Sequence, residues 1–368
     1  LGPAGREPVR PARRHPAPAG GGRRAVRRRD AQCRPQHPSR RHAGICRHCR
    51  ETGSRHLVRP LNDGHDFVFQ LGGHAPRLSV GPGEQFTVFT EDCFSGRLTS
   101  VDGRPREVAP YPKVNPLVGP IAVEGIKAGD IMAIRLHRLE PARDWGVATI
   151  SPNFGFLSGT RASPNLQAEQ EERVWIWCLA SDRTELTTQT SSGRTLRAGY
   201  RPFHGTLGVA PAHGEVRLGV VPGDFGGNFD IPDLTEGATL YLRANIDGGH
   251  IYIGDGHYAQ GDGEIAGTAV EGAFFTTLSV ERATADESFD WPRLETESHI
   301  GVIGCARPLD DAARIAAAGL VRWVAHRTGL DTMDAHQLVS QTCSLRIGNV
   351  VNPAFTVLCS VPKAVLSQ

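Results

Sequence analysis

The chain has 368 residues, enough for one large domain or two ordinary ones, and its formal net charge of +2 conceals a segregation of charge. Residues 1–60 hold 16 of the 41 basic and 3 of the 39 acidic residues, a net charge of +13, which leaves −11 for residues 61–368. An acidic body argues against nucleic acid as a partner. No apolar run approaches the roughly 18 residues of a membrane span, so we expect no membrane partner either.

Cysteine usage indicates the compartment. Of the 8 cysteines, only Cys46 and Cys49 form a C-x-x-C pair, and the others are scattered. This pattern favours reduced thiols over a disulfide framework, and the N-terminus lacks the apolar stretch of a secretory signal. We therefore expect a cytoplasmic protein.

Residues 1–60 consist largely of Arg, Pro, Gly, Ala and His, with too few apolar side chains to form a core. Such a composition predicts a disordered extension. One interpretation is a basic arm that binds nucleic acid. The other is translation of GC-rich DNA upstream of a true start, which the lack of Lys and the initial Leu1 favour. On this second interpretation the Cys and His residues of the segment are incidental.

From His65 onward the sequence predicts short strands. Segments in which a Gly-containing turn precedes alternating apolar residues span 81–90, 128–136, 236–244 and 271–280, and further strand-like runs span 174–179 and 216–221. Alternation with a period of two after a turn signal indicates a half-buried strand. We therefore predict a mainly-β fold, either a β-sandwich or a jelly-roll.

Helices are expected only near the C-terminus. Residues 310–328 have apolar side chains at helical spacing, Asp310 or Asp311 as a cap and Gly329 as a stop. A shorter helix is expected at about 334–343, followed by strands at 344–351 and 355–361. These elements predict a small C-terminal α/β appendage on the β body.

The stretch 254–267, G-D-G-H-Y-A-Q-G-D-G-E-I-A-G, follows an alternating segment at 241–253 and concentrates chemically active side chains. Because residues two apart in a strand share a face, Asp255 and His257 should lie together, as should Asp262 and Glu264. The intervening glycines Gly256, Gly261 and Gly263 permit positive φ. If the segment folds back, these groups suit a divalent metal or proton transfer. An acidic, glycine-rich surface turn is the alternative.

Other candidate residues are dispersed along the chain. Asp92 and Cys93 lie in T-E-D-C-F at the end of a predicted strand, and His204 precedes the small residues T-L-G-V-A-P. The segment F-G-G-N-F-D at 225–230 has two adjacent glycines whose backbone N–H groups could face an oxyanion. Its candidate substrate or oxyanion residues are Phe225, Gly226, Gly227 and Asn228.

Six motifs in this order resemble the acetamidase/formamidase family: T-E-D-C-F, N-P-L-V-G-P-I-A-V-E-G-I-K-A-G-D, L-G-V-A-P, G-G-N-F-D-I-P-D-L, G-D-G-H-Y-A-Q-G-D-G-E and R-I-G-N-V-V-N-P. The resemblance covers roughly residues 60–366. It implies that residues 61–368 form one catalytic domain with a jelly-roll-like antiparallel β-sandwich body. It also implies that the protein assembles as a homo-oligomer and hydrolyses short linear amides to ammonia and a carboxylate. One departure is Phe225, where family members commonly carry His, and it puts the identity of the acyl group in doubt.

The mechanism we expect uses water activated by a divalent metal, Zn²⁺ or, given the oxygen-rich set, Ca²⁺. Its ligands would be Asp92, Asp255 and His257. Glu264 or Asp262 would act as the general base, and His204 would protonate the leaving ammonia or complete the metal shell.

Two alternatives remain open. Cys93, which follows Asp92, could be the nucleophile of an amidase, or the body could be a non-catalytic β-sandwich that binds a ligand. In either case the late helices and the strand at 344–351 offer apolar surface, so we expect a homodimer or a larger homo-oligomer.

Overall fold

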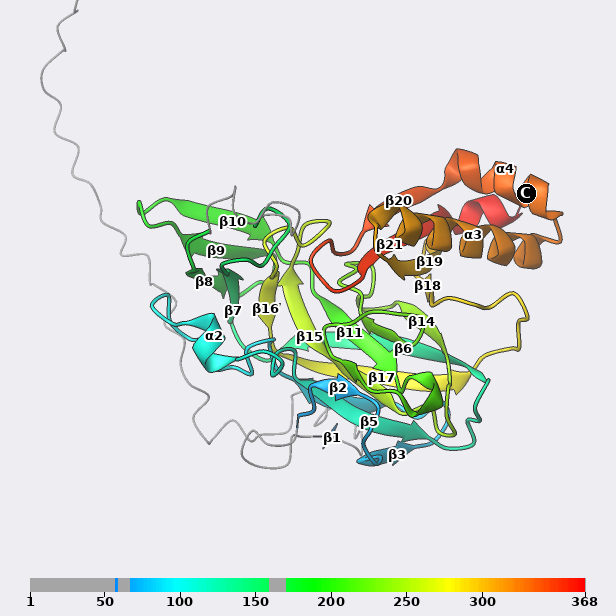
Figure 1. The fold of residues 1–368 in the computed structure, drawn as a ribbon, viewed down its shortest axis with the longest axis horizontal. Coiled ribbons are helices and arrows are strands. Elements are labelled where there is room, and N and C mark those ends of the chain that lie inside the picture. Colours follow the sequence, from blue (N-terminus) through cyan, green and yellow to red (C-terminus); the bar gives the residue numbers. More distant parts are fainter. Residues whose placement is uncertain (1–56, 59–66, 159–169, 368) are drawn as a thin grey trace, which may run out of the picture. The chain divides into compact units, whose positions relative to one another are not determined.

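Two large β-sheets form most of the fold in the computed structural model, which describes residues 57–58, 67–158 and 170–367 (Figure 1). The first sheet has nine strands in the order β1 (Leu57–Val58), β4 (Phe86–Thr90), β17 (Phe274–Arg282), β6 (Ile131–Pro141), β14 (Thr239–Arg243), β18 (Arg293–Glu295), β19 (His299–Ala306), β21 (Phe355–Pro362) and β20 (Ser344–Ile347). Its pairs are antiparallel except for β1 with β4.

The second sheet contains the strands that carry the candidate site. Its main path is β10 (Thr195–Gly199), β9 (Glu185–Gln189), β8 (Arg173–Leu179), β7 (Trp145–Ile150), β16 (Val270–Gly272), β15 (Ile251–Ala259), β11 (Phe203–Val209) and β13 (Gly226–Asn228). Strand β5 (Leu117–Val123) also pairs with β15, and β3 (Leu78–Val80) runs parallel to β5. Smaller elements are β2 (Gln70–Leu71), β12 (Arg217–Leu218), α2 (Pro105–Val108), η3 (Ala212–Gly214) and η4 (Lys363–Ser367).

The main hydrophobic core lies between the two sheets. Phe86 and Ile134 come from the first sheet and Leu207 and Ile253 from the second, and all four are fully buried in one cluster. Burying a side chain of this size contributes roughly 1.5–3 kcal/mol. The predicted mainly-β sandwich is therefore confirmed.

The C-terminal part has a core of its own, formed by α3 (Leu309–Thr328) and α4 (Thr332–Thr342) against β19 and β21. Helix α3 buries Ala312, Ala316, Leu320 and Val324, which are spaced four apart and so share one face. The strands under the helices continue the first sheet, so the α/β appendage is an extension of the sandwich.

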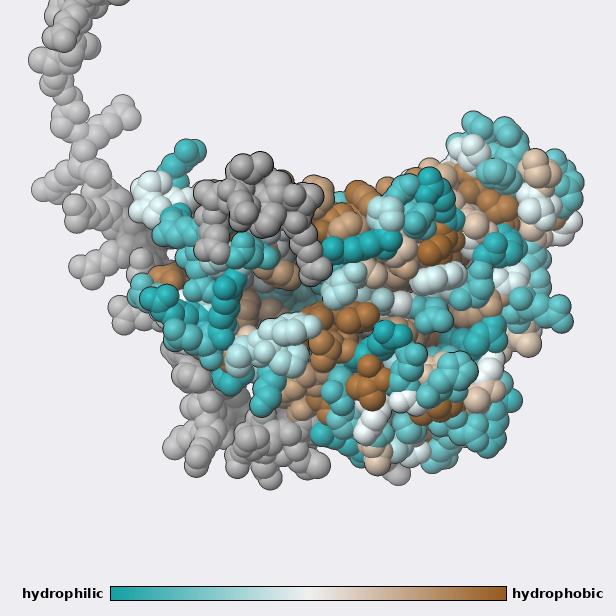
Figure 2. Space-filling model, viewed as in Figure 1, coloured by the Kyte–Doolittle hydropathy of each residue, from teal (hydrophilic) through white to brown (hydrophobic). Residues whose placement is uncertain are grey.

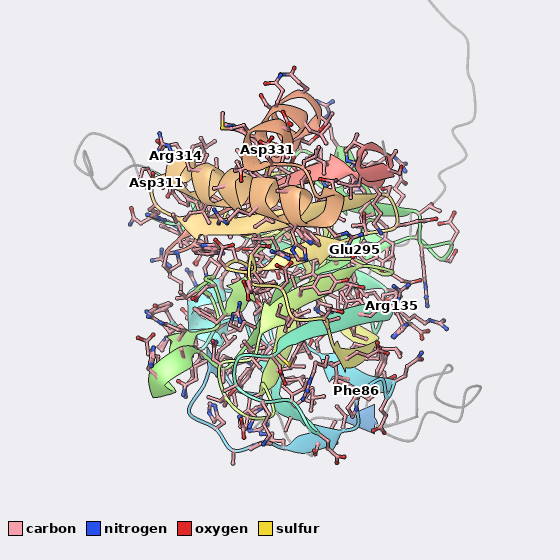
Figure 3. The ribbon with its side chains drawn as sticks, turned by 90° about the vertical axis from the view of Figure 1, so that its right-hand side faces the viewer. Phe86, Arg135, Glu295, Asp311, Arg314 and Asp331 are labelled. Atoms are coloured by element: carbon pink, nitrogen blue, oxygen red, sulfur yellow. The ribbon has the colours of Figure 1, made fainter. Side chains whose placement is uncertain are left out.

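Both helix ends follow from local chemistry, with one correction to the sequence analysis. Helix α3 begins after Pro308, and Asp310 and Asp311 lie in its first turn. Their negative charges interact favourably with the positive end of the helix dipole, but neither side chain caps the helix. Figure 3 labels Asp311 at this end of α3. Gly329 ends α3 in the left-handed conformation, as predicted. Helix α4 begins earlier than predicted because the Asp331 side chain accepts the backbone N–H groups of Met333 and Asp334.

Some strand boundaries were predicted wrongly. Within the predicted strand at 216–221 only Arg217–Leu218 is extended, and the predicted segment at 241–253 turns between β14 and β15. The run at 271–280 is divided between β16 and β17, which belong to different sheets. Because of this division, the start of the run lies in β16, the strand that pairs with β15 and carries Glu271 of the candidate site.

The predicted extension at residues 1–60 lies outside the described residues except for Leu57–Val58, whose backbone pairs with β4. Among the residues that the structure describes, no helix is long and apolar enough to cross a membrane.

Candidate active site

Strand β15 carries the centre of the candidate site through the interior of the fold. Eight of its nine residues are buried, so the alternative of a surface turn is wrong for this part of the stretch. Gly256 is needed here because a Cβ would collide with the Phe274 ring of the opposite sheet. The strand brings Asp255 and His257 into one buried group, as the period-two pattern predicts.

Backbone strain is concentrated in the acidic residues of this region. Asp230, Asp255 and Glu264 have φ values of 53°, 53° and 48°. A non-glycine residue in the left-handed region costs on the order of 1–3 kcal/mol, and such residues cluster at functional sites. Of the glycines predicted to take positive φ, Gly263 does so at 89°, whereas Gly256 and Gly261 do not.

Four buried carboxylates lie around His257, and the Cys93 thiol lies beside two of them. His257 Nε2 lies 3.5 Å from Asp255 Oδ2 and 3.4 Å from Glu271 Oε2. The pairing of β15 with β16 places Glu271 directly opposite His257. Ligand atoms fall into two groups, each within 4.8 Å: Asp230, His257 and Glu264 in one, and Cys93, Asp255 and Glu271 in the other. We call His257 and the four carboxylates of these groups the buried cluster.

Gln260 fixes the orientation of the His257 ring. Its Nε2 donates to the carbonyls of Asp230 and Gly348 at 2.8 and 3.0 Å, so its Oε1 is free to accept from His257 Nδ1 at 2.9 Å. With the Nδ1 proton held there, His257 Nε2 faces Asp255 and Glu271. In a neutral imidazole this nitrogen offers a lone pair, the form that binds metals.

Several polar atoms of the buried cluster make no hydrogen bond among the described residues. His257 Nε2, Glu271 Oε2 and Asp230 Oδ1 are buried and make no hydrogen bond. A Cβ on Gly205 would lie 2.6 Å from both Asp230 Oδ1 and Asp255 Oδ2, so glycine leaves the space between these carboxylates free. Buried polar atoms without partners are rare in native proteins and indicate a missing ion or molecule.

Burial and mutual repulsion shift the pKa values of the buried cluster. Burial raises the pKa values of Asp230, Glu264 and Glu271 above their ordinary range, and neighbouring carboxylates raise them further. Burial alone would lower the pKa of His257, but Glu271 and Asp255 raise it well above its usual value. Such a group is self-repulsive unless a cation or shared protons neutralise it.

His204 lies beside the buried cluster with both ring nitrogens engaged. Nδ1 donates to the Gly254 carbonyl at 2.9 Å, and Nε2 accepts from Thr276 Oγ1 at 2.7 Å. Burial lowers the pKa of His204 to about 4, so the ring is neutral near pH 7. The side chain thus joins β11 to the adjacent strand β15 and to β17 of the first sheet, and it has no free nitrogen for a metal or a leaving group.

Replacing His204 by Gln should remove a defined part of the pH dependence of stability. The folded-state pKa of about 4 lies below the ordinary 6.5, so the unfolded chain binds the proton first and stability falls as pH drops from 6.5 to 4. We expect this fall to be smaller by about 3 kcal/mol in His204→Gln than in the wild type. Urea unfolding of both proteins at pH 4 and pH 7 measures the difference, and identical pH dependence would contradict it.

Asp92 is held in a tight loop next to the buried cluster. Its Oδ1 accepts the backbone N–H groups of Phe94 and Gly96, each at 2.9 Å, and Arg143 Nη2 lies 3.2 Å from its Oδ2. Burial raises the pKa of Asp92 to about 7. Burial also raises the pKa of the Cys93 thiol well above its ordinary value, and this thiol lies within 4.8 Å of a Glu271 carboxylate oxygen.

Asp262 does not join the buried cluster. Its side chain is 55% exposed, and Oδ1 lies 3.4 Å from Arg346 Nε. Glu264 is buried, so the prediction that Asp262 and Glu264 share a face is wrong. The turn at Gly261–Gly263 separates the two carboxylates.

The segment around Gly226 and Gly227 supports the site through its backbone and through Asn228. The two glycines, with φ values of 92° and 100°, lie in β13 against β11, and the Gly226 N–H donates to the Gly223 carbonyl. The Asn228 amide donates to Asp230 Oδ2 at 3.0 Å and accepts from Asn115 and Thr206. Phe225 is buried in the main hydrophobic core.

Sequence reasoning missed four residues that complete the site. Asp230 and Glu271 carry carboxylates of the buried cluster, Gln260 orients His257, and Asn352 donates to Asp230 Oδ2 at 2.6 Å. Asp230, Gln260 and Asn352 lie within the family motifs and could have been selected there. Glu271 gave no comparable signal, because the sequence around it is that of an ordinary strand.

Comparison with known proteins agrees with this architecture. The acetamidase/formamidase family model matches residues 75–218 and 215–368. A solved acetamidase from Yersinia enterocolitica is 35% identical, with 85% of this chain and 93% of that chain covered and a TM-score of 0.78. An acetamidase structure from Bacillus halodurans is 29% identical, with 84% and 98% covered and a TM-score of 0.74.

Among curated proteins, a formamidase from Methylophilus methylotrophus is 27% identical over 229 residues, which cover 50% of this chain and 56% of that protein. The chain thus spans about half the length of the curated relatives it matches. Since the family pattern extends over most of the described body and the fold agrees with that of solved relatives, the chain belongs to the acetamidase/formamidase family.

Proposed function

We propose that the protein is a metal-dependent hydrolase of short linear amides, which releases ammonia and a carboxylate. The observation that carries this proposal is the buried cluster, in which His257 Nε2, Glu271 Oε2 and Asp230 Oδ1 make no hydrogen bond within the described chain. Relatives that are acetamidases and formamidases support the choice of substrate.

The buried cluster suits a divalent cation, which His257, Asp255, Glu271 and Asp230 would hold. One imidazole with carboxylates is a donor set for Zn²⁺, our first choice, while the excess of oxygens keeps Ca²⁺ as the second. When bound, such a cation polarises an amide carbonyl and makes water a stronger acid. Its charge would also offset the repulsion among the carboxylates.

The other roles in the proposed reaction are assigned to side chains and backbone of the protein itself. Glu264 is buried within the cluster and is our candidate for the base that takes a proton from water and returns it to the leaving nitrogen. Asp262, the other predicted base, is exposed and paired with Arg346, so the geometry favours Glu264. We assign positioning roles to His204, Asn228 and Asp92, because the contacts described above occupy their polar atoms. Gly226 and Gly227 provide close backbone packing in this scheme, and Phe225 an apolar wall.

A second candidate is an amidase in which Cys93 is the nucleophile. The contact between the Cys93 thiol and Glu271 favours it, since a carboxylate could accept the thiol proton. The raised pKa of Cys93 opposes it, because the thiolate is the reactive form. A non-catalytic binding module is the remaining alternative.

Ammonia release from formamide and acetamide tests the proposal. A sample loaded with Zn²⁺ should release ammonia from at least one of them, and chelation should abolish release until metal is restored. Full activity after chelation, with loss of activity in Cys93→Ala, would favour the cysteine mechanism. Binding of amides without turnover would favour the binding module.

We further propose a cytoplasmic homodimer or larger homo-oligomer. The C-terminal part exposes Leu330, Met333 and Leu345 by 39, 73 and 57%, and apolar side chains reach the surface in this region (Figure 2). Such surface is suited to contact between copies. The cytoplasm is proposed from the scattered cysteines of the sequence.

A further inference from the structure

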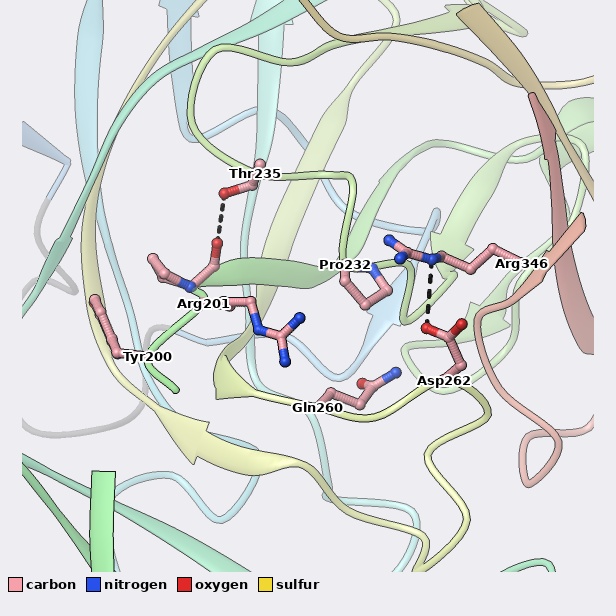
Figure 4. Close-up of a pocket in the computed structure, with 8 residues that line it drawn as sticks. Tyr200, Arg201, Pro232, Thr235, Gln260, Asp262 and Arg346 are labelled. Atoms are coloured by element: carbon pink, nitrogen blue, oxygen red, sulfur yellow. Dashed lines mark hydrogen bonds and ion pairs between the residues drawn. The ribbon is translucent and has the colours of Figure 1, made fainter. Parts of the chain in front are cut away.

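A surface pocket of about 360 Å³ adjoins the buried cluster (Figure 4). Its walls come from residues 200–202, from Pro232 and Thr235, from Gln260 and Asp262, and from Arg346. These segments also carry the site: Phe203 and His204 follow the first, Asp230 precedes the second, and the third lies between His257 and Glu264. The pocket is therefore built on the segments that build the site.

Gln260 contributes both to the pocket and to the hydrogen bonds that hold the buried cluster. Its side chain lines the pocket, and its Oε1 accepts the Nδ1 proton of His257. One side chain thus separates a molecule in the pocket from the buried cluster. A molecule in the pocket would therefore contact the side chain that orients His257.

The pocket contains an arginine without a counter-charge. Arg201 is exposed, and Figure 4 shows its guanidinium directed into the pocket near Gln260. No acidic side chain of the described residues pairs with it. Arg346, in contrast, is held by Asp233 at 2.6 Å and by Asp262 at 3.4 Å. Arg201 is thus the pocket's available group for an anion, and guanidinium binds a carboxylate through paired hydrogen bonds.

The size of the pocket and the charges around it together predict how a bound molecule would be oriented. Formamide and acetamide are far smaller than this pocket, whose volume lies in the usual range of about 300 to 1,000 Å³ for ligand sites. The Tyr200 ring, Pro202 and Pro232 provide apolar wall for a short hydrocarbon chain. The carboxylates of the buried cluster repel an anion, so an anionic end would lie outward at Arg201 while the amide faces inward.

We propose that the preferred substrate is an amide whose short acyl chain ends in a carboxylate, that is, the half-amide of a dicarboxylic acid, and that Arg201 binds this carboxylate. The inference rests on the proposed function. In the reaction, water adds to the amide carbonyl, the C–N bond breaks, the nitrogen leaves as ammonia and a dicarboxylate remains.

The test compares succinamate with butyramide, which lacks the terminal carboxylate, in the wild type, Arg201→Gln and Arg201→Lys. We expect kcat/KM for succinamate to exceed that for butyramide at least tenfold, and Arg201→Gln to lose about 10- to 100-fold on succinamate only. Arg201→Lys should keep part of the preference. Arg194→Gln is the matched control, since Arg194 is an exposed arginine in the turn between β9 and β10, outside the pocket.

Calorimetric binding of succinate, the product, separates this inference from the proposed function. Binding that is weakened by Arg201→Gln and unchanged by Arg194→Gln supports the pocket's ligand class even if no amide is hydrolysed, in which case the proposed function alone fails. Two results together would overturn the inference and leave the proposed function intact: hydrolysis of acetamide with no preference for succinamate, and an affinity for succinate that Arg201→Gln does not change.

Discussion

Replacing His257 by Ala should abolish both amide hydrolysis and metal binding. His257 Nε2 lies 3.5 and 3.4 Å from two carboxylate oxygens but makes no hydrogen bond within the described chain, so the proposed cation would lose its nitrogen ligand. We expect turnover to fall by more than the roughly 10- to 100-fold typical of residues that only support a metal ligand. Elemental analysis after dialysis, together with ammonia release, measures both losses.

Glu264→Gln is the informative companion to His257→Ala. The substitution keeps the size of the side chain but removes the proton acceptor, so turnover should fall by about 10²- to 10⁴-fold while most of the metal remains. The matched control is Glu297→Gln, at an exposed glutamate in the loop between β18 and β19 and outside the pocket, and it should leave turnover within a few fold. Near-normal turnover in Glu264→Gln would show that another group acts as the base, and retention of metal in His257→Ala would remove His257 from the ligands.

Adding one methyl group at Gly205 should inactivate the enzyme while the fold persists. A Cβ there would lie 2.6 Å from Asp230 Oδ1, 2.6 Å from Asp255 Oδ2 and 2.9 Å from His257 Cε1, in the space between the carboxylates. All three atoms belong to side chains that can shift, so we expect Gly205→Ala to destabilise the protein by only about 1–3 kcal/mol. Turnover should fall by more than about 100-fold, because the displaced carboxylates no longer converge.

Gly261→Ala is the control for Gly205→Ala. Gly261 follows the end of β15, has no positive φ, and a Cβ there would meet no atom within 4 Å. Its turnover and metal content should match those of the wild type. If Gly205→Ala also hydrolyses amides normally, the space beside Gly205 is not part of the reaction site.

The local pattern of the sequence predicted those parts of the site that lie on one strand. Asp255 and His257 share a face because β15 is continuous through both residues, so the period of two applies. The same rule failed for Asp262 and Glu264 because the chain turns between them. Helix α3 was predicted with its end because Gly329 and the spacing of its apolar residues are local signals.

The remainder of the site depends on strand pairing, which no local pattern contains. Glu271 meets His257 only because β16 pairs with β15 in one register, and a shift of one residue would turn its side chain to the other face. Asp230 reaches the buried cluster through a left-handed backbone and the amides of Asn228 and Asn352. The family motifs indicated which segments matter, but only the tertiary structure shows which side chains meet.

The amides of the C-terminal segment have a consequence for how the enzyme matures. Asn352 donates to Asp230 and the Gly348 carbonyl accepts from Gln260, so the segment 348–352 completes a site whose other residues lie far from it in the sequence. Contacts between residues so distant in sequence form late, after most loops have closed. The catalytic geometry is therefore complete only in molecules in which the segment 348–352 has docked against Gln260 and Asp230, and molecules without this contact should be inactive even where the rest of the fold has formed.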